Sequence, residues 1–199
     1  MITEMQVLAN LDGYNNKIQK CIQNAVQHYQ EKLSDEAAII SQSTKANYIR
    51  DLIVENAQKT FYGDPNVSVI RQRGMIVFVF STDPHIILKF KKFNKRNRVA
   101  YSRTMQAFAF LNQEEELFPS YQKQVHLHAG YKWNETGTTI ECLIGYPNGE
   151  GKHAWIADLS GRISAPLIHI VETQEQTQIP KPQIILKIKP IKETNEKNG

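Results

Sequence analysis

The sequence predicts an α+β protein in which N-terminal amphipathic helices pack against a mainly antiparallel β-sheet. Three observations support this class. Apolar residues recur every three or four positions over the first third of the chain, as on one face of a helix. From residue 67 onward, short runs of β-branched and aromatic residues are separated by turn residues. With 199 residues, 41% of them hydrophobic, the chain is long enough to bury a core.

The first expected elements are two helices. One long helix carries an apolar stripe formed by Val7, Leu11, Tyr14, Ile18, Ile22, Val26, Tyr29 and Leu33. A second helix begins at a cap, Ser43 or Thr44. Its apolar face consists of Ala46, Ile49, Ile53, Ala57 and Phe61. The stripe of the first helix needs a partner, so we expect it either to pack on the second helix or to form a homodimer or partner-protein interface.

Three antiparallel strands are expected after a turn at residues 63–66, with the sequences VSVIRQ, MIVFVF and HIILKFKKF. A short helix follows, opened by Asn97 or Ser102, and we expect it to bury Phe108 and Leu111.

A second group of strands, QVHLHAGYKW, TTIECLIGYP and KHAWIADLSG, is expected to form a meander. The chain therefore divides into an N-terminal helical part, residues 1–62, and a β-rich core with one helix, residues 63–172, in the same domain. Residues 173–199 have the composition of an exposed linker, an edge strand and a polar tail.

The segment LKFKKFNKRNR, residues 88–98, carries six cationic side chains and no carboxylate. Alternation along the strand directs its apolar groups toward the core and its lysines toward water, which also protects sheet edges from aggregation. The cations continue past the strand, however, and such side chains contact phosphates. The predicted nucleic-acid-binding residues are Arg71, Arg73, Lys89, Lys91, Lys92, Lys95, Arg96, Arg98 and Arg103. We expect non-specific binding, because no helix-turn-helix, zinc-finger or RNP-type signature is present; an acidic partner protein and a merely solvated sheet rim are the alternatives.

Histidines suggest a different class of function. His126 and His128 lie two residues apart on a predicted strand and so share a face; with Glu141 on the next strand they define an alternative site for a metal-dependent or metal-free ribonuclease. His153 and Asp158 are further candidates by hairpin adjacency. Two ligands are too few for a metal site, and strand histidines are more often polar surface residues or hydrogen-bonded core groups. A charged, solvent-facing strand explains the same residues. We therefore expect no metal and no cofactor, and we prefer binding over catalysis while leaving an enzyme open.

A carboxylate–lysine nuclease would need two acidic groups and a lysine that converge on a metal. Asp64, Asp83 and Lys89 are candidates for these roles, but both acids precede prolines in turns. Ile87 stands two positions before Lys89, where such a site needs an acid. Glycine-rich phosphate loops, nucleophile elbows and zinc-ligand spacings are absent from the sequence, which disfavours several other enzyme classes.

Cysteine usage and the N-terminus bear on the compartment. Cys21 and Cys142 are far apart and have no metal-ligand spacing, which favours a reducing, cytoplasmic compartment. The N-terminus lacks a basic start followed by an apolar run, and no stretch approaches the roughly 18 apolar residues of a membrane span. We therefore expect no membrane association.

Four segments together resemble a family of small uncharacterised bacterial proteins from toxin–antitoxin or phage-defence operons. They are FKKFNKRNR at 90–98, TMQAFAFLNQ at 104–113, HAGYKWNETGTTIE at 128–141 and AWIADL at 154–159. The resemblance covers about residues 45 to 160. It implies a toxin-like component that binds nucleic acid or a partner protein through its basic face and is restrained by a cognate regulatory protein. None of its motifs is an established catalytic box, so the resemblance assigns no active-site residue.

Overall fold

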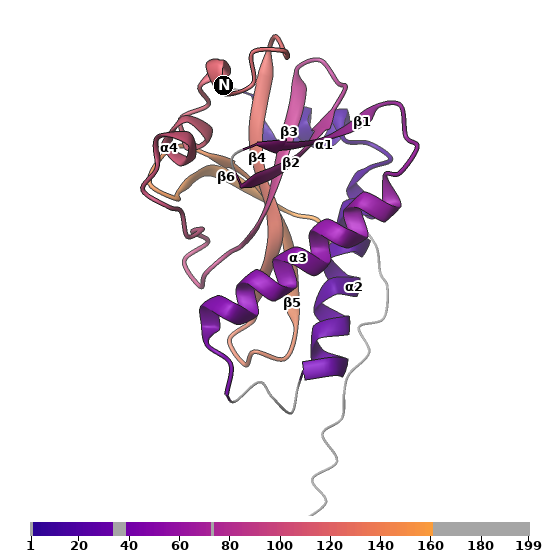
Figure 1. Ribbon diagram of the computed structural model, residues 1–199, viewed down its shortest axis with the longest axis vertical. Helices are drawn as coiled ribbons and strands as arrows, with labels where there is room; N and C mark the ends of the chain where they lie inside the picture. The colour runs from indigo at the N-terminus through magenta and orange to yellow at the C-terminus, as the bar shows by residue number, and fades with distance from the viewer. Residues whose placement is uncertain (1, 34–38, 73, 161–199) are drawn as a thin grey trace, which may run out of the picture. The chain divides into compact units, whose positions relative to one another are not determined.

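The computed structural model describes residues 2–33, 39–72 and 74–160, which belong to one compact unit (Figure 1). It confirms the predicted α+β class, with helices preceding a six-stranded, mainly antiparallel sheet. The expected linker, edge strand and tail at 173–199 lie outside the described residues, as does Arg73.

The predicted first helix is two helices. Helix α1 spans Glu4–Asn10 and α2 spans Asn15–Leu33, and between them the chain turns at Gly13, whose φ of 79° lies in the left-handed region that glycine favours. The apolar stripe nevertheless continues across the break. Its members Val7, Leu11, Ile18, Ile22, Val26 and Tyr29 are all buried in the main core.

Helix α3 spans Gln42–Thr60 and packs on α2. Its cap is Ser41, whose side chain accepts a hydrogen bond from the backbone N–H of Thr44, so the predicted cap was wrong by two or three residues. The apolar face is as predicted, since Ile49, Ile53, Ala57 and Phe61 are buried. The stripe of the first two helices therefore finds its partner within the chain, on α3 and on the sheet.

The strands lie side by side in the sheet in the order in which they occur along the chain. Its strands are β1 (Val67–Gln72), β2 (Met75–Phe80), β3 (His85–Lys92), β4 (Gln124–Trp133), β5 (Ile140–Pro147) and β6 (His153–Asp158). Neighbours are antiparallel except β3 and β4, which are parallel. These two strands are joined by a crossover that contains helix α4, Met105–Leu111, and the short 3₁₀ helix η1, Glu115–Leu117. Both predicted groups of antiparallel strands are thus confirmed.

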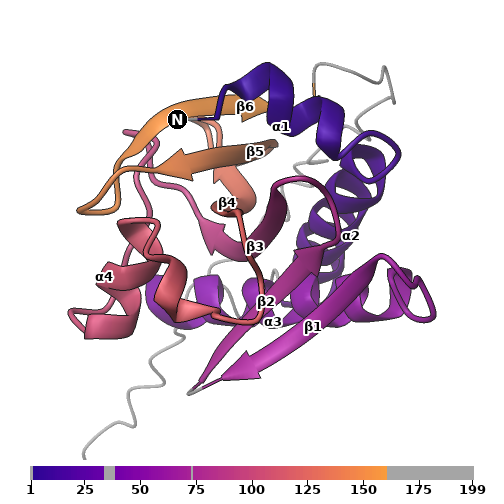
Figure 2. The same ribbon diagram turned by 90° about the horizontal axis from the view of Figure 1, so that it is seen from above.

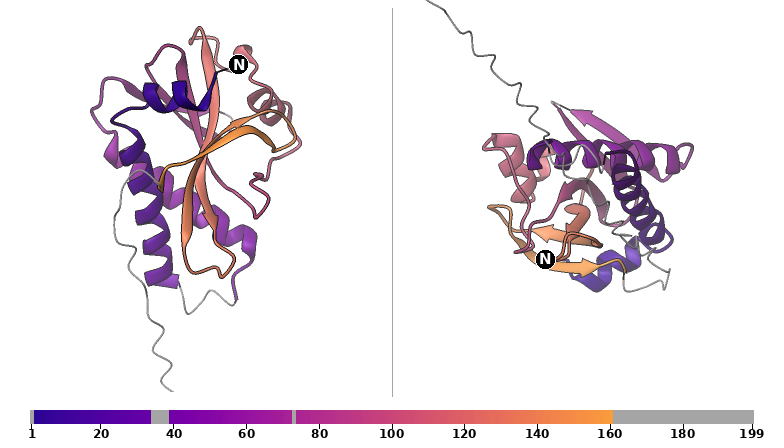
Figure 3. Two further views of the ribbon diagram at one scale, coloured as in Figure 1. Left: turned by 180° about the vertical axis from the view of Figure 1, so that it is seen from behind. Right: turned by 90° about the horizontal axis from the view of Figure 1, so that it is seen from below.

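The two faces of the sheet have different covers. Helices α1, α2 and α3 pack on one face, where Phe78, Leu88 and Tyr131 join the main core. On the other face α4 and η1 cover a smaller apolar cluster around Val77, Ile87 and Phe110, so α4 and α2 lie on opposite sides of the sheet (Figure 2). The long β4–β5 hairpin runs beside α2 (Figure 3).

Helix α4 spans Met105–Leu111 and is capped by Thr104, whose side chain accepts from the backbone N–H of Ala107. The predicted caps, Asn97 and Ser102, were therefore too early. Leu111 is buried as expected, but Phe108 is 38% exposed and Phe110 is buried in its place.

Within the described part of the chain, no helix combines the length and the apolar character that crossing a membrane requires.

Candidate nucleic-acid interface

Three of the predicted cations, Lys95, Arg96 and Arg98, lie in a tight loop, residues 94–98, which we call the cationic loop. Phe93 and Val99 close it by forming an isolated antiparallel bridge. Both side chains are buried against Leu143 of β5. The loop is therefore a short excursion between two anchored residues, although its own side chains are exposed.

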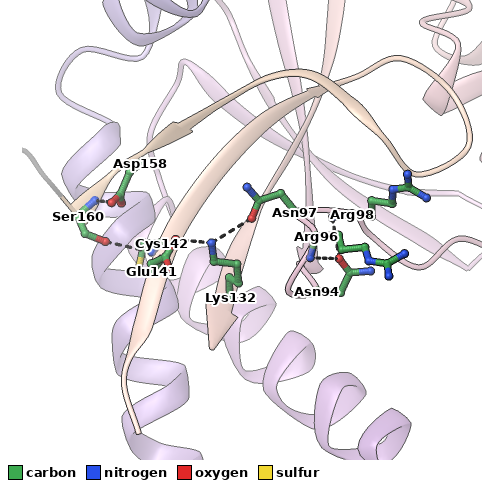
Figure 4. Close-up of polar contacts among 9 residues, drawn as sticks. All are labelled: Asn94, Arg96, Asn97, Arg98, Lys132, Glu141, Cys142, Asp158 and Ser160. Carbon is green, nitrogen blue, oxygen red and sulfur yellow. Dashed lines mark hydrogen bonds and ion pairs between the residues drawn. The ribbon is translucent and has the colours of Figure 1, made fainter. Parts of the chain in front are cut away.

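Asn94 organises the inside of the cationic loop. Its Oδ1 accepts hydrogen bonds from the backbone N–H groups of Arg96, at 2.9 Å, and Arg98, at 3.0 Å. The guanidinium groups of these arginines extend away from this bonded core, on the side opposite Lys132 (Figure 4). The backbone is thus fixed from within while the charges stay accessible.

A second contact ties the loop to the sheet. Lys132 of β4 donates to Oδ1 of Asn97 at 3.0 Å and forms an ion pair with Glu141 of β5 at 2.7 Å (Figure 4). Asn97 has a φ of 56°, in the left-handed region that asparagine tolerates better than most residues. Glu141 is therefore paired with Lys132 and not with His128. Lys132 lies four residues from His128 along β4, a separation of about 13 Å.

The lysines of β3 differ from the prediction. Alternation along the strand is as expected, but the side that carries Lys89 and Lys91 is covered by α4 and by the chain after the cationic loop, so both lysines are half-buried. The ammonium of Lys91 donates to the carbonyl oxygen of Ala100 at 3.0 Å, and that of Lys89 lies 5.3 Å from the ring centroid of Phe110. Burial, then Lys91 and then Arg50 lower the pKa of Lys89 to about 8.

These lysines line a small cavity of about 20 Å³, which we call the polar hollow. Its other polar walls are Tyr101, Ser102 and His128, and its apolar walls come from α4. A volume of that order admits about one water-sized group. No carboxylate lies among the lining residues, so an anionic group entering the hollow would meet cations and neutral donors only.

His128 is joined to His153 rather than to Glu141. Its Nδ1 lies 3.1 Å from Nε2 of His153, and Nδ1 of His153 lies 3.2 Å from the carbonyl oxygen of Asn97. Gly145 makes this contact possible, because a Cβ there would come within 2.7 Å of the His153 ring. The pair therefore links β4, β6 and the cationic loop.

His126 occupies a fully buried position behind this pair. Its ring stacks on Phe110 at a centroid distance of 4.8 Å, and its Nε2 lies 2.9 Å from Oε1 of Gln124. The amide nitrogen of Gln124 faces three backbone carbonyl oxygens at 2.7 to 3.1 Å, which turns its own oxygen toward His126. Burial lowers the pKa of His126 to about 4 and that of His128 well below 6.5. The interpretation of these histidines as solvent-facing was therefore wrong, while the alternative of hydrogen-bonded core groups and the shared face of the two histidines are confirmed.

The remaining predicted cations fall into two groups. Lys95, Arg96, Arg98 and Arg103 are exposed. Lys92 is half-buried, and Arg71 is exposed on the helix-covered side of the sheet, because its pairing partner Ile76 packs into the main core. No ion pair involves any of these six cations, Lys89 or Lys91 within the part of the chain that the structure describes.

Helix α3 adds positive charge that the sequence did not indicate. Lys45 contributes to a lowered pKa of Lys92, after burial, and Arg50 does the same for Lys91. The sequence alone could not indicate that these cations of α3 lie near the lysines of β3, because it does not show that α3 packs on β3.

The acidic candidates and the two cysteines do not line the polar hollow. Asp64 accepts from the backbone of Asn66, and Asp158 accepts from the backbone N–H of Ser160. Cys21 and Cys142 are buried, and burial raises the pKa of Cys142 to about 12, so its thiol is not a nucleophile at neutral pH. Among the described residues, no three His, Cys, Asp or Glu side chains are grouped as a metal site would require.

Comparison of the chain with protein-family models, with curated proteins and with solved structures found no match in any of the three.

Proposed function

We propose that this protein binds the phosphate backbone of single-stranded nucleic acid, with little sequence preference, through the cationic loop and its surroundings. One observation carries the proposal: four exposed cations, Lys95, Arg96, Arg98 and Arg103, lie on or just after a rigid loop and have no carboxylate partner among the described residues. Unpaired arginines and lysines at such density favour phosphates, whose oxygens accept from both side chains.

The rigidity of the loop supports this interpretation. Asn94 and Asn97 hold the backbone, so little conformational entropy is lost when a ligand binds. Apolar groups lie beside the cations as well. Phe108 is 38% exposed and packs edge-to-face on Tyr101, and Met105 is 90% exposed. Aromatic side chains next to cations are typical of surfaces that stack unpaired bases.

The resemblance to proteins of toxin–antitoxin and phage-defence operons gives this proposal a biological setting. We propose a toxin-like component whose nucleic-acid surface is covered, in the restrained state, by a cognate protein. Such a protein would present acidic side chains to the same four cations, since these are the exposed charges of the loop.

The test is fluorescence anisotropy with a short labelled single-stranded RNA and a DNA of the same sequence. Four phosphate contacts predict a slope of about −3 for log affinity against log salt, or a loss of roughly 50-fold between about 50 and about 200 mM salt. Similar affinities for RNA, DNA and scrambled sequences are expected, because no base-reading element is involved.

Charge-reversal variants identify the surface. The test variant is K95E/R96E/R98E/R103E, which should abolish binding and leave the circular-dichroism spectrum unchanged because all four side chains are exposed. The matched control is K17E/K20E/K32E/K59E, which changes the net charge equally on exposed helix positions. Equal binding by both variants would refute the proposal. Competition by polyglutamate as strong as by RNA would do so too, in favour of an acidic protein partner.

A further inference from the structure

The two hydrogen bonds of the histidine pair fix which nitrogen of His128 is basic. The carbonyl oxygen of Asn97 can only accept, so Nδ1 of His153 carries a proton and donates to it. Nε2 of the neutral His153 is then an acceptor, and Nδ1 of His128 donates to it. The proton of His128 is therefore on Nδ1, and its Nε2 carries a lone pair.

That lone pair is available to a ligand. His128 lines the polar hollow although its side chain is only 2% exposed, and its Nε2 has no hydrogen-bond partner among the described residues. Phe110 stacks on the ring at 5.3 Å and holds its orientation. An imidazole that is held in one orientation, with a nitrogen free to accept a proton from a bound group, is the arrangement that general bases show in enzymes.

An ammonium group shares the same hollow. Lys89 of β3 and His128 of β4 are directly paired in the parallel register, and their side chains rise from the same face of the sheet. Lys91, two residues further along β3, also lines the hollow. Its ammonium donates one proton to the carbonyl oxygen of Ala100 and has two more N–H donors for a ligand. A candidate base, His128, and two candidate acids, Lys89 and Lys91, therefore line the same hollow, and no carboxylate lines it.

We propose that the protein cleaves RNA without a metal ion at the mouth of the polar hollow, with one oxygen of the phosphodiester entering the hollow, His128 as the general base and Lys89 as the general acid. This rests on the proposed function, because the cationic loop must hold the strand at the mouth of the hollow. Nε2 of His128 removes the proton of a 2′-hydroxyl, and the 2′-oxygen attacks the adjacent phosphorus. The P–O5′ bond breaks, and the leaving 5′-oxygen takes a proton from the ammonium of Lys89. The products are a 2′,3′-cyclic phosphate and a 5′-hydroxyl, and DNA is not a substrate because it lacks the attacking group.

The protonation states at neutral pH suit these roles. Burial, and then the charges of His153, Lys91, Lys89 and His126, keep the pKa of His128 below 6.5, so the ring is unprotonated and can accept a proton. A bound phosphate places a negative charge beside the ring, which raises that pKa toward neutrality. Lys89, whose pKa is about 8, is still mostly protonated at pH 7 and yields its proton more easily than an exposed lysine.

His153 is a positioning residue in this scheme, because it acts on the substrate only through His128. When His128 gains a proton, the positive charge is shared through His153 to the carbonyl of Asn97. Gly145 supplies the space that the ring of His153 needs over β5.

The experiment uses the full chain, a short fluorescent RNA and excess EDTA, with the cyclic-phosphate product identified by mass spectrometry. His128→Gln and Lys89→Met keep the side-chain volumes and should each reduce cleavage about 10²- to 10⁴-fold. The matched controls, His28→Gln and Lys59→Met, lie on exposed helix positions and should leave the rate unchanged. His153→Phe should lower kcat with little change in KM and should shift the acid limb of the pH profile.

A non-cleavable RNA with 2′-O-methyl groups separates the two proposals. If the wild-type protein binds this RNA but cleaves no unmodified RNA, the inference fails and the proposed function stands. If it binds neither RNA nor DNA, the proposed function fails. Cleavage by a folded His128→Gln variant at the wild-type rate, or cleavage that EDTA abolishes, would overturn the inference.

Discussion

Phe110 is the side chain on which the burial of the site depends. It is 1% exposed, and its ring lies 4.8 Å from the ring of His126 and 5.3 Å from both the ring of His128 and the ammonium of Lys89. Phe110→Ala removes this cover and leaves a cavity that the surrounding sheet cannot fill. Truncation of a fully buried phenylalanine costs about 3–5 kcal/mol of the free energy of unfolding. We expect a loss in that range by urea denaturation.

The same substitution should change the ionisation of the site. Burial is the largest cause of the lowered pKa values of His126, about 4, and Lys89, about 8, so admitting water should raise both toward 6.5 and 10.5. NMR titration of the imidazole and ammonium signals measures this. Phe108→Ala on the same helix is the control, because a side chain that is 38% exposed should cost about 1 kcal/mol or less. A loss below about 1 kcal/mol for Phe110→Ala, with unchanged pKa values, would refute the reasoning.

Two further predictions concern the whole fold. Stability should fall as the pH drops from 6.5 to about 4, because in that window the unfolded chain binds a proton at His126 that the folded protein excludes. This one group accounts for on the order of 3 kcal/mol, and a flat series of urea midpoints over the window would contradict it. Gly130→Ala should prevent folding, because the new Cβ would overlap the backbone carbonyl oxygen of Lys91 on the paired strand. A soluble Gly130→Ala variant with the wild-type melting temperature would contradict that packing.

The fold class and most elements were predictable because they depend on local periodicity. The six strands and the faces of α2 and α3 follow from patterns of two and of three to four residues. The break at Gly13 was missed because the apolar stripe resumes beyond it in the same phase. Phe110 was missed because which aromatic of α4 is buried depends on how the crossover lies on the sheet.

The site was predictable only in its composition. A run of cations without carboxylates indicated an anionic ligand, and the strand pattern correctly put His126 and His128 on one face. Their burial was not predictable, because it is caused by α4, a non-local cover. The partner of His128 is His153, 25 residues further on, and it reaches that position across a register shift between β5 and β6. The glycine at 145 was the one local signal, since glycine within a strand often marks a close approach.

The charge balance of the hollow bears on the ligand that we propose for it. Burial lowers the pKa values of both Lys89 and Lys91, nearby cations lower them further, and none of the hollow's lining residues is a carboxylate that would compensate. Burying unpaired cations costs folding free energy, and an apolar side chain at either position would remove that cost. Phosphate binding would offset that cost, because one anionic oxygen in the hollow faces both ammonium groups at once. The electrostatics that disfavour the free protein would therefore favour the proposed complex with a phosphodiester.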